Sequence, residues 1–296
     1  MIRNCKKKIS QKISAFTMTE LAVTCAVIAV VAVAVIKTQT IVQKADLVAQ
    51  SWTAQYKTKA ADVITVPIPQ NGLRLWLDAS SDKAFDSKPQ NGQTVEIWKD
   101  LSENGNNATQ TQYSSQRPLY IQNGLNSLPT LEFDGVDDNL LFDGSYMAQN
   151  SYSFFMVMKG TRPTNQYNFA VGKTGCSTGQ CLVMGFWTGG SALHSHWHNN
   201  TYISLGSLYS TKLIHSVTFD KSSGFRIFKI NGGNLGTKSG STYAISSFSS
   251  AKLGSVNSFR FKGQISEVIA YDRALTTQET QEVESYLAEK YNIVIN

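Results

Sequence analysis

The sequence predicts a mainly β protein in which a long N-terminal α-helix precedes an antiparallel β-sandwich and a short C-terminal helix ends the chain. Three observations predict this fold class. An uncharged run, Leu21–Ile36, follows a basic N-terminus. From about residue 72, short alternating apolar runs are separated by turn residues. A helical apolar stripe behind a capping sequence closes the chain. The expected divisions are 1–15, a basic leader; 16–61, a transmembrane and assembly helix; 62–71, a linker; and 72–296, the sandwich.

Composition and charge narrow the class of partner. The 296 residues are 42% hydrophobic and only 16% charged, which suits a β-rich exported domain. The net charge of +6 comes mainly from the first fifteen positions, which hold five of the 27 basic residues and no acidic one. The remaining 22 basic residues face 21 acidic ones. Because nucleic-acid binding needs a basic face on the folded domain, we expect no nucleic-acid partner.

The segment Phe16–Ile36 carries a single charge, Glu20. At about 1.5 Å per residue a helix of this length spans about 30 Å, enough for the hydrocarbon core of a bilayer. The basic leader predicts a cytoplasmic N-terminus, a single pass through the inner membrane and export of the rest. A secretory signal peptide and a plain signal anchor are the alternatives. An apolar stripe then extends the helix through Ile41, Ala45, Val48, Trp52 and Tyr56.

The run Ala15–Leu21, with the sequence AFTMTEL, resembles the prepilin motif of type IV pilins and type II secretion pseudopilins. The resemblance implies cleavage between Ala15 and Phe16 by a prepilin peptidase, with methylation of the new N-terminus. Ala15 stands where the family usually has Gly. Glu20 matches the assembly glutamate, whose buried carboxylate seeks the terminal amine of a neighbouring subunit. The implied partners are other pilin subunits, the peptidase and the assembly machinery.

The β region begins after Pro67, Pro69 and the turn Asn71-Gly72. Leu73, Leu75 and Leu77 alternate with polar or aromatic residues, as in a half-buried strand. Many short strands with turn residues between them predict an antiparallel sandwich or jelly roll. The further expected strands are Val95–Trp98, Thr130–Phe133, Ser153–Met158, Asn168–Gly172, Cys181–Phe186, Lys212–Phe219, Gly224–Ile230 and Gln264–Tyr271.

A helix is expected at the C-terminal end. Thr276, with Glu279 three positions later, has the spacing of a capping box. Val283, Leu287 and Tyr291 then recur at the helical period, so this stripe should dock on the sandwich.

Three segments resemble concanavalin A-like, laminin-G-like domains: Gly72–Ala79, Leu131–Asp138 and Gly263–Leu275 with the helix behind it. They occur in that order over about residues 70–296. The resemblance implies a lectin-like jelly roll, a fold that lectins, adhesion modules and some enzymes share, so it does not by itself assign a function.

Two clusters are candidate metal sites. Asp134, Asp137 and Asp138 lie close together, with Asp143 nearby, and carboxylates in such a group bind Ca²⁺ or cap turns. We favour turn capping, with Ca²⁺ as the alternative; the sequence establishes no cofactor with certainty. In the second cluster, His194, His196 and His198 would share one face of an extended strand. Such a face binds Zn²⁺ or Cu²⁺, lines a sugar site, or is a solvated strand edge.

Two further features suit an exported domain. Cys176 and Cys181 bracket a short turn-rich loop, which predicts a disulfide in an oxidising compartment. Exposed aromatic side chains stack on the apolar faces of sugars. The candidates for this role are Trp187, Trp197, Tyr202 and Tyr209.

The sequence therefore predicts a pilin-like or pseudopilin-like subunit that displays a lectin-like domain for adhesion or for binding a surface glycan or protein. The displayed domain would be periplasmic, or extracellular on a pilus. A purely structural minor subunit and a membrane-anchored lectin-like protein that does not polymerise are the alternatives. No nucleophile elbow, phosphate loop or metal-hydrolase motif occurs, so we expect no enzyme.

Overall fold

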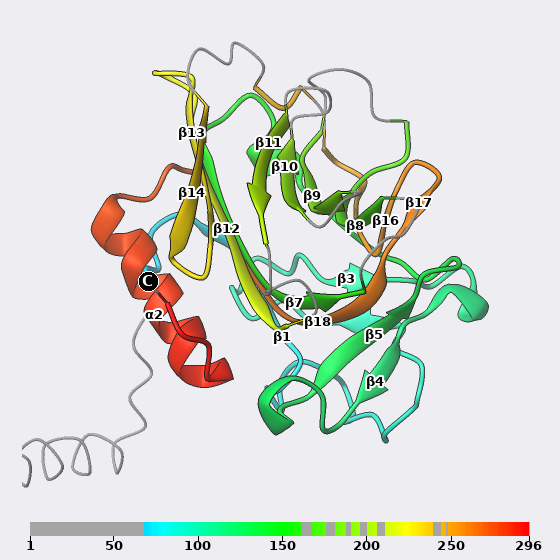
Figure 1. Cartoon of the computed structure of the whole chain (residues 1–296). Helices are drawn as coiled ribbons and strands as arrows, with labels where there is room; N and C mark the ends of the chain where they lie inside the picture. Colours follow the sequence, from blue (N-terminus) through cyan, green and yellow to red (C-terminus); the bar gives the residue numbers. More distant parts are fainter. Residues whose placement is uncertain are drawn as a thin grey trace, which may run out of the picture. The chain divides into compact units, whose positions relative to one another are not determined.

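The computed structural model describes residues 68–161, 167–175, 181–187, 191–195, 200–205, 211–238, 244–246 and 248–295. The chain divides into two units between Ile64 and Thr65, and the described residues belong to the second. This unit is mainly β, with antiparallel sheets and a C-terminal helix (Figure 1).

Sheet A contains eight strands among the described residues. Its order is β14-β13-β12-β7-β18-β5-β4, and β1 also pairs with β18. The first part of β18 pairs with β5 and the second part with β1, while β7 runs along its other edge. The bounds are β1 Leu73–Asp78, β4 Leu119–Ile121, β5 Thr130–Asp134, β7 Tyr152–Gly160, β12 Leu213–Asp220, β13 Phe225–Ile230, β14 Gly233–Lys238 and β18 Lys262–Tyr271.

Sheet B also contains eight strands within the described ranges, in the order β11-β10-β9-β8-β15-β6-β3-β2. A small hairpin, β16 Ser255–Val256 with β17 Phe259–Arg260, makes a third sheet. Single 3₁₀ turns occupy Ser114–Gln116, Leu125–Ser127 and Ser145–Met147. The bounds of sheet B are β2 Ile97–Trp98, β3 Ala108–Thr109, β6 Leu140–Phe142, β8 Asn168–Gly172, β9 Val183–Trp187, β10 Ser191–Ser195, β11 Asn200–Ser204 and β15 Ala251–Leu253.

The central strands of sheet A are covered on both faces. In β7, Phe154 and Met156 belong to the main core between the two sheets, whereas Phe155 and Val157 belong to a second core. The second core also contains Leu287 of helix α2, Thr277–Tyr291. Because side chains alternate across a strand, one run of apolar residues supplies both cores.

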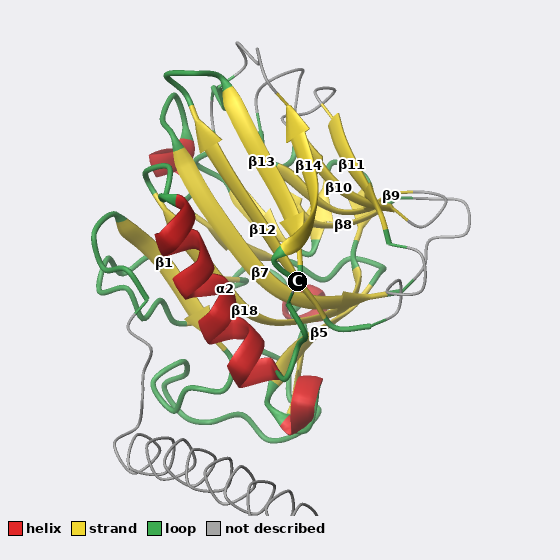
Figure 2. Ribbon diagram, turned by 60° about the vertical axis from the view of Figure 1, so that its left-hand side comes forward, coloured by secondary structure: helices red, strands yellow, loops and turns green. Residues whose placement is uncertain are grey.

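Helix α2 lies across the face of sheet A that is turned away from sheet B (Figure 2). The predicted capping box is confirmed: Thr276 Oγ1 accepts from the backbone N–H of Glu279, and the Glu279 carboxylate accepts from the backbone N–H of Thr276 at 2.9 Å. The left-handed residue Asn292, with φ 48°, ends the helix. The stripe of Val283, Leu287 and Tyr291 is buried, as expected.

A buried carboxylate ties the helix to the sheet. Glu267 of β18 is 0% exposed, and four donors surround its two oxygens. Lys290 Nζ donates to Oε2 at 2.7 Å and also to Asp78 Oδ2 at 2.7 Å. Burial raises the pKa of Glu267, and the charge of Lys290 opposes that rise. The remaining donors are Trp76 Nε1 at 2.7 Å, Tyr286 OH at 2.9 Å and Tyr291 OH at 2.9 Å.

A second polar contact fixes the same helix. Glu284 of α2 accepts from Ser216 Oγ at 2.6 Å and pairs with Lys229 Nζ at 3.0 Å. Ser216 lies on β12 and Lys229 on β13, so the helix is bound to the sheet at two separated places.

The predicted fold class needs correction in its first element. The one α-helix among the described residues is α2, and a long N-terminal helix is no part of the described fold, because residues 16–61 lie outside it. Among the residues that the structure describes, no helix combines the length and the apolarity needed to cross a bilayer. The single-pass inner-membrane location inferred from Phe16–Ile36 is therefore not supported.

Replacing Lys290 by Met should destabilise the fold strongly. The substitution keeps the aliphatic stem but leaves Glu267 and Asp78 as buried carboxylates without their shared cation, which typically costs about 3–5 kcal/mol. Urea denaturation followed by tryptophan fluorescence measures the free energy of unfolding. Lys88→Met is the control, because Lys88 and its partner Asp82 are 53% and 88% exposed and little change is expected. A loss for Lys290→Met as small as that of the control would contradict this role of Glu267.

Candidate functional site

The outer face of sheet B, turned away from sheet A, carries a cluster of aromatic rings. Phe186 of β9 faces the interior, where its ring lies 5.5 Å from that of His215 in sheet A. Trp187, the next residue in the strand, therefore points outward. Its ring stacks on that of Tyr167 at 4.0 Å with an interplanar angle of 21°. Both side chains are partly exposed.

Phe169 and Phe259 complete this cluster. The ring of Phe259 lies 4.9 Å from that of Tyr167 and 5.5 Å from that of Phe169, edge to face in both cases. Phe169 is buried and Phe259 is partly exposed. We name the three partly exposed residues, Tyr167, Trp187 and Phe259, the aromatic patch. Flat rings that remain partly open to solvent offer a surface on which a sugar can stack.

The hairpin β16–β17 brings Phe259 to this face. The hairpin packs over β8 at Gly172, where an added Cβ would lie 2.0 Å from Val256 Cγ2. A residue larger than glycine would therefore push the hairpin away from the sheet. Close packing at Gly172 thus places Phe259 beside Tyr167.

A row of side chains runs across the strands from the same place. Lys252 of β15 pairs in register with Gly172 on one side and with Leu141 of β6 on the other, and Leu141 pairs with Thr109 of β3. Ala251 and Leu253, on either side of Lys252, are buried in the core, so the Lys252 side chain points outward. The row Thr109–Leu141–Lys252 therefore continues the aromatic patch across sheet B.

Two adjoining pockets lie at the far end of this row. One, of about 400 Å³, is lined by Thr109, Leu141 and Asp143 among others. The other, of about 460 Å³, shares Asp143 with it and is lined also by Arg74 and Tyr146. The charge of Arg74 is already paired with Asp272 at 2.6 Å. The two pockets together extend the row as a polar groove. Arg74 is the cation among the residues that line this groove, and its charge is paired with Asp272.

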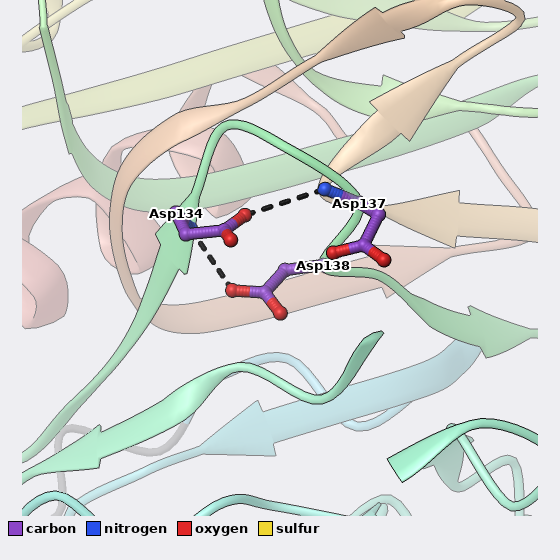
Figure 3. A group of neighbouring side chains, drawn as sticks. All are labelled: Asp134, Asp137 and Asp138. Carbon is purple, nitrogen blue, oxygen red and sulfur yellow. Dashed lines mark hydrogen bonds between the residues drawn. The ribbon is translucent and has the colours of Figure 1, made fainter. Parts of the chain in front are cut away.

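The acidic cluster forms the turn between β5 and β6 (Figure 3). Asp134 Oδ1 accepts from the backbone N–H of Val136 at 2.7 Å and of Asp137 at 3.4 Å, while Asp138 Oδ2 accepts from the backbone N–H of Asp134 at 2.9 Å. One carboxylate oxygen from each aspartate lies within 4.8 Å of the others. The geometry thus contains the turn capping that the sequence favours, and Ca²⁺ binding stays a prediction.

Burial distinguishes Asp138 from its neighbours. Its side chain is 6% exposed, and burial raises its pKa to about 7, with the charges of Asp134 and Asp137 acting in the same direction. A bound cation would reverse this balance by favouring the ionised carboxylates.

The histidine cluster is only partly described. His194 is buried in the core, where its Nε2 lies 3.2 Å from Tyr152 OH, and it is no part of a solvated strand edge. His196 and His198 lie outside the described residues. His215 is also buried, no hydrogen bond reaches its ring nitrogens, and burial lowers its pKa to about 3. Within the described ranges, the aspartate cluster is the one group of three such side chains placed to hold a metal ion.

Some of the other predicted site residues lie within the described residues and others lie outside them. Cys181 is buried and disulfide-bonded, and its partner lies outside the described residues, so the pairing with Cys176 stays a prediction. Tyr202 lies in β11, but its side chain is not among those described. Of the predicted aromatic residues, Trp187 alone has a described side chain. Ala15, Phe16, Glu20, Cys176, Trp197 and Tyr209 lie outside the described residues.

Tyr167, Phe259, Lys252 and Arg260 were not predicted as site residues. Tyr167 is adjacent to the expected strand Asn168–Gly172, and an aromatic residue at the end of that strand was the available signal. The pair Phe259-Arg260 lies in a two-residue strand that no sequence period reveals.

No family model and no curated protein matches the chain. Solved structures share its fold. The binding domain of Paraclostridial Mosquitocidal Protein 1 is 15% identical with a TM-score of 0.53, over 73% of this chain and 53% of that one. A Trypanosoma rangeli sialidase in complex with 2,3-difluoro-KDN is 14% identical with a TM-score of 0.51, over 77% and 34%. A GH54 α-L-arabinofuranosidase is 13% identical with a TM-score of 0.50, over 66% and 50%.

At these identities the likeness establishes the fold alone. The chain spans only about a third to a half of the length of these proteins. Because a sialidase and an arabinofuranosidase share the fold, the fold gives no support to the expectation that the chain is not an enzyme.

Asp138→Asn should flatten part of the pH dependence of stability. The folded pKa of about 7 lies above the usual value near 4, so the stability contributed by protonated Asp138 is present below about pH 4 and is lost as the pH rises through about 7. Relative to the Asn variant, the parent protein should lose several degrees of melting temperature between pH 4 and pH 8. Calorimetry at the two pH values measures this difference. The same difference in melting temperature between parent and variant at both pH values would contradict this prediction. A rise in the melting temperature of the parent at pH 8 on adding Ca²⁺ would establish a cation site.

Proposed function

We propose that the folded domain binds carbohydrate on the outer face of sheet B, with Tyr167, Trp187 and Phe259 as the stacking surface. One observation carries the proposal: three aromatic side chains from separate parts of the chain meet on this face and remain partly exposed. The three rings pack against the main core, as the buried ring of Phe169 does, yet each keeps part of its surface exposed to solvent.

The surroundings of the patch support a ligand with several linked rings. The row Thr109–Leu141–Lys252 leads from the patch to the polar groove, and it crosses the strands without an intervening helix among the described residues. A linear saccharide could therefore stack one ring on the patch and lay others along the row, an arrangement that multiplies weak contacts.

We propose binding rather than hydrolysis at this face. Charged side chains that adjoin the patch in register and sequence include Lys173, Lys252 and Arg260, which are all cations. Hydrolysis of a glycosidic bond normally needs two carboxylates beside the scissile bond. An assay for reducing sugar released from each bound glycan tests this part, since release that depends on the patch would establish an enzyme.

Display on a filament is a further part of the proposal, and the sequence AFTMTEL at Ala15–Leu21 favours it. In that case the domain would serve adhesion or capture at a surface. If no glycan binds, a purely structural subunit is the better explanation.

Trp187→Ala and Tyr167→Ala should weaken glycan binding by roughly tenfold each, because an aromatic contact contributes about 0.5–1.5 kcal/mol beyond its buried area. Affinity electrophoresis of the full-length protein in gels that contain a polysaccharide measures the change. Tyr113→Ala is the matched control, since Tyr113 is 50% exposed, pairs with Gln112 and lies outside the patch. Equal retardation of all three variants and the parent would remove the patch from the binding site.

Processing of the N-terminus tests the filament proposal separately. We expect the protein isolated from its native source to begin at Phe16 with a methylated amine, because the run Ala15–Leu21 resembles the prepilin motif. Intact-mass and N-terminal peptide mass spectrometry make this measurement. A chain that begins at Met1 would argue against peptidase processing and leave glycan binding unaffected.

A further inference from the structure

Two cations adjoin the aromatic patch, Lys252 opposite Gly172 and Arg260 directly after Phe259. Lys252 points outward from β15 and is partly buried. Arg260, on β17, is also partly buried, and its Nη1 donates to the backbone oxygens of Asn257 at 2.8 Å and of Phe259 at 3.3 Å. The bonds to the backbone hold the guanidinium at the turn of the hairpin. They leave its other N–H groups for a ligand.

No described carboxylate forms an ion pair with either cation. The ion-paired cations of the described residues lie elsewhere, on Arg74, Lys88, Lys99, Arg117, Lys229, Arg273 and Lys290. Burial lowers the pKa of Lys252, and the nearby charge of Arg260 lowers it further. Two like charges that are partly desolvated repel each other, and an anion between them would relieve that repulsion.

The position of the pair relates it to the patch. Arg260 directly follows Phe259, whose ring contacts Tyr167, and Lys252 pairs in register with Gly172 beneath the same hairpin. A sugar ring stacked on the patch can therefore direct a substituent of its own, or of the next sugar, toward the two cations.

We infer that the glycan bound on this face is acidic, with the carboxylate of a uronic acid received by Lys252 and Arg260. This inference rests on the proposed carbohydrate-binding function and names the class of sugar. A guanidinium and an ammonium together match a carboxylate, because the first binds it through a planar fork and the second as a point charge.

Nucleic acid is the competing polyanion with flat rings. Its affinity comes from many phosphate contacts along an extended basic surface. Beyond residue 15 the chain has 22 basic and 21 acidic residues, and the pair Lys252–Arg260 is a local feature of β15 and the hairpin that follows it. The observations therefore favour an acidic polysaccharide that is bound by stacking of its sugar rings and by a contact to one of its carboxylates.

The test compares one oligouronate with its carboxyl-reduced form, in which each carboxylate has become a neutral alcohol. Isothermal titration of the full-length protein at low salt should show at least tenfold tighter binding of the acidic form. Lys252→Met and Arg260→Gln should each abolish most of that preference and leave the affinity for the reduced form unchanged. Lys83→Met is the control, since Lys83 is an exposed lysine outside this face.

The outcomes separate this inference from the proposed function. If the protein binds the oligouronate and its reduced form equally, and Trp187→Ala abolishes this binding, the acidic specificity is overturned. The proposed carbohydrate binding then stands. Absence of binding to both forms would overturn the two together. Tighter binding of single-stranded DNA than of the oligouronate would overturn the inference in favour of a nucleic-acid partner. In the absence of ligand, Lys252→Met should melt no lower than the parent protein, so a loss of affinity is not a loss of fold.

Discussion

The carboxylate of Glu267 is the interaction on which the arrangement of the domain depends. A carboxylate that is 0% exposed is tolerable only when donors satisfy both oxygens, and here the donors come from β1 and from α2. The same group therefore fixes the sheet edge and the helix together. Because α2 covers one face of sheet A and sheet B covers the other, β7 and β18 can be apolar on both sides. Sheet B keeps its outer face for other uses.

Irregular features, not the regular strands, shape that outer face. A register shift between Phe169 and Val171 in the pairing of β8 with β9 allows Phe169 and Gly172 to share a side. Gly172 then admits the hairpin β16–β17, which carries Phe259 and Arg260. Without the register shift, the regular alternation of side chains along β8 would have placed Phe169 and Gly172 on opposite faces of sheet B. The proposed binding surface thus depends on one bulge, one glycine and one short hairpin.

Sequence patterns predicted the longer strands and the helix. Asn168–Gly172 is a strand with the expected bounds, the alternating leucines from Leu73 lie in a strand, and Thr276 with Glu279 caps α2 as expected. Strands of two or three residues, such as β2, β3 and β16, have too few positions for a period to show. Glu267 lies in an apolar strand whose pattern cannot tell which face a helix will cover. Trp187 was predicted as a ligand-binding residue, but its partners Tyr167 and Phe259 meet it only through tertiary packing.

The position of β18 in sheet A has a consequence for the order of events during synthesis. β18 joins β1 and β5 to β7, yet it follows all the other strands in the described sequence, and the contact between Arg74 and Asp272 closes a separation of 198 residues. Such long-range pairing is slow, and the early strands emerge with unpaired edges and uncovered apolar faces. Among the described strands, sheet A can be completed only after β18 has been made, so the early strands are exposed to aggregation until that last strand is available.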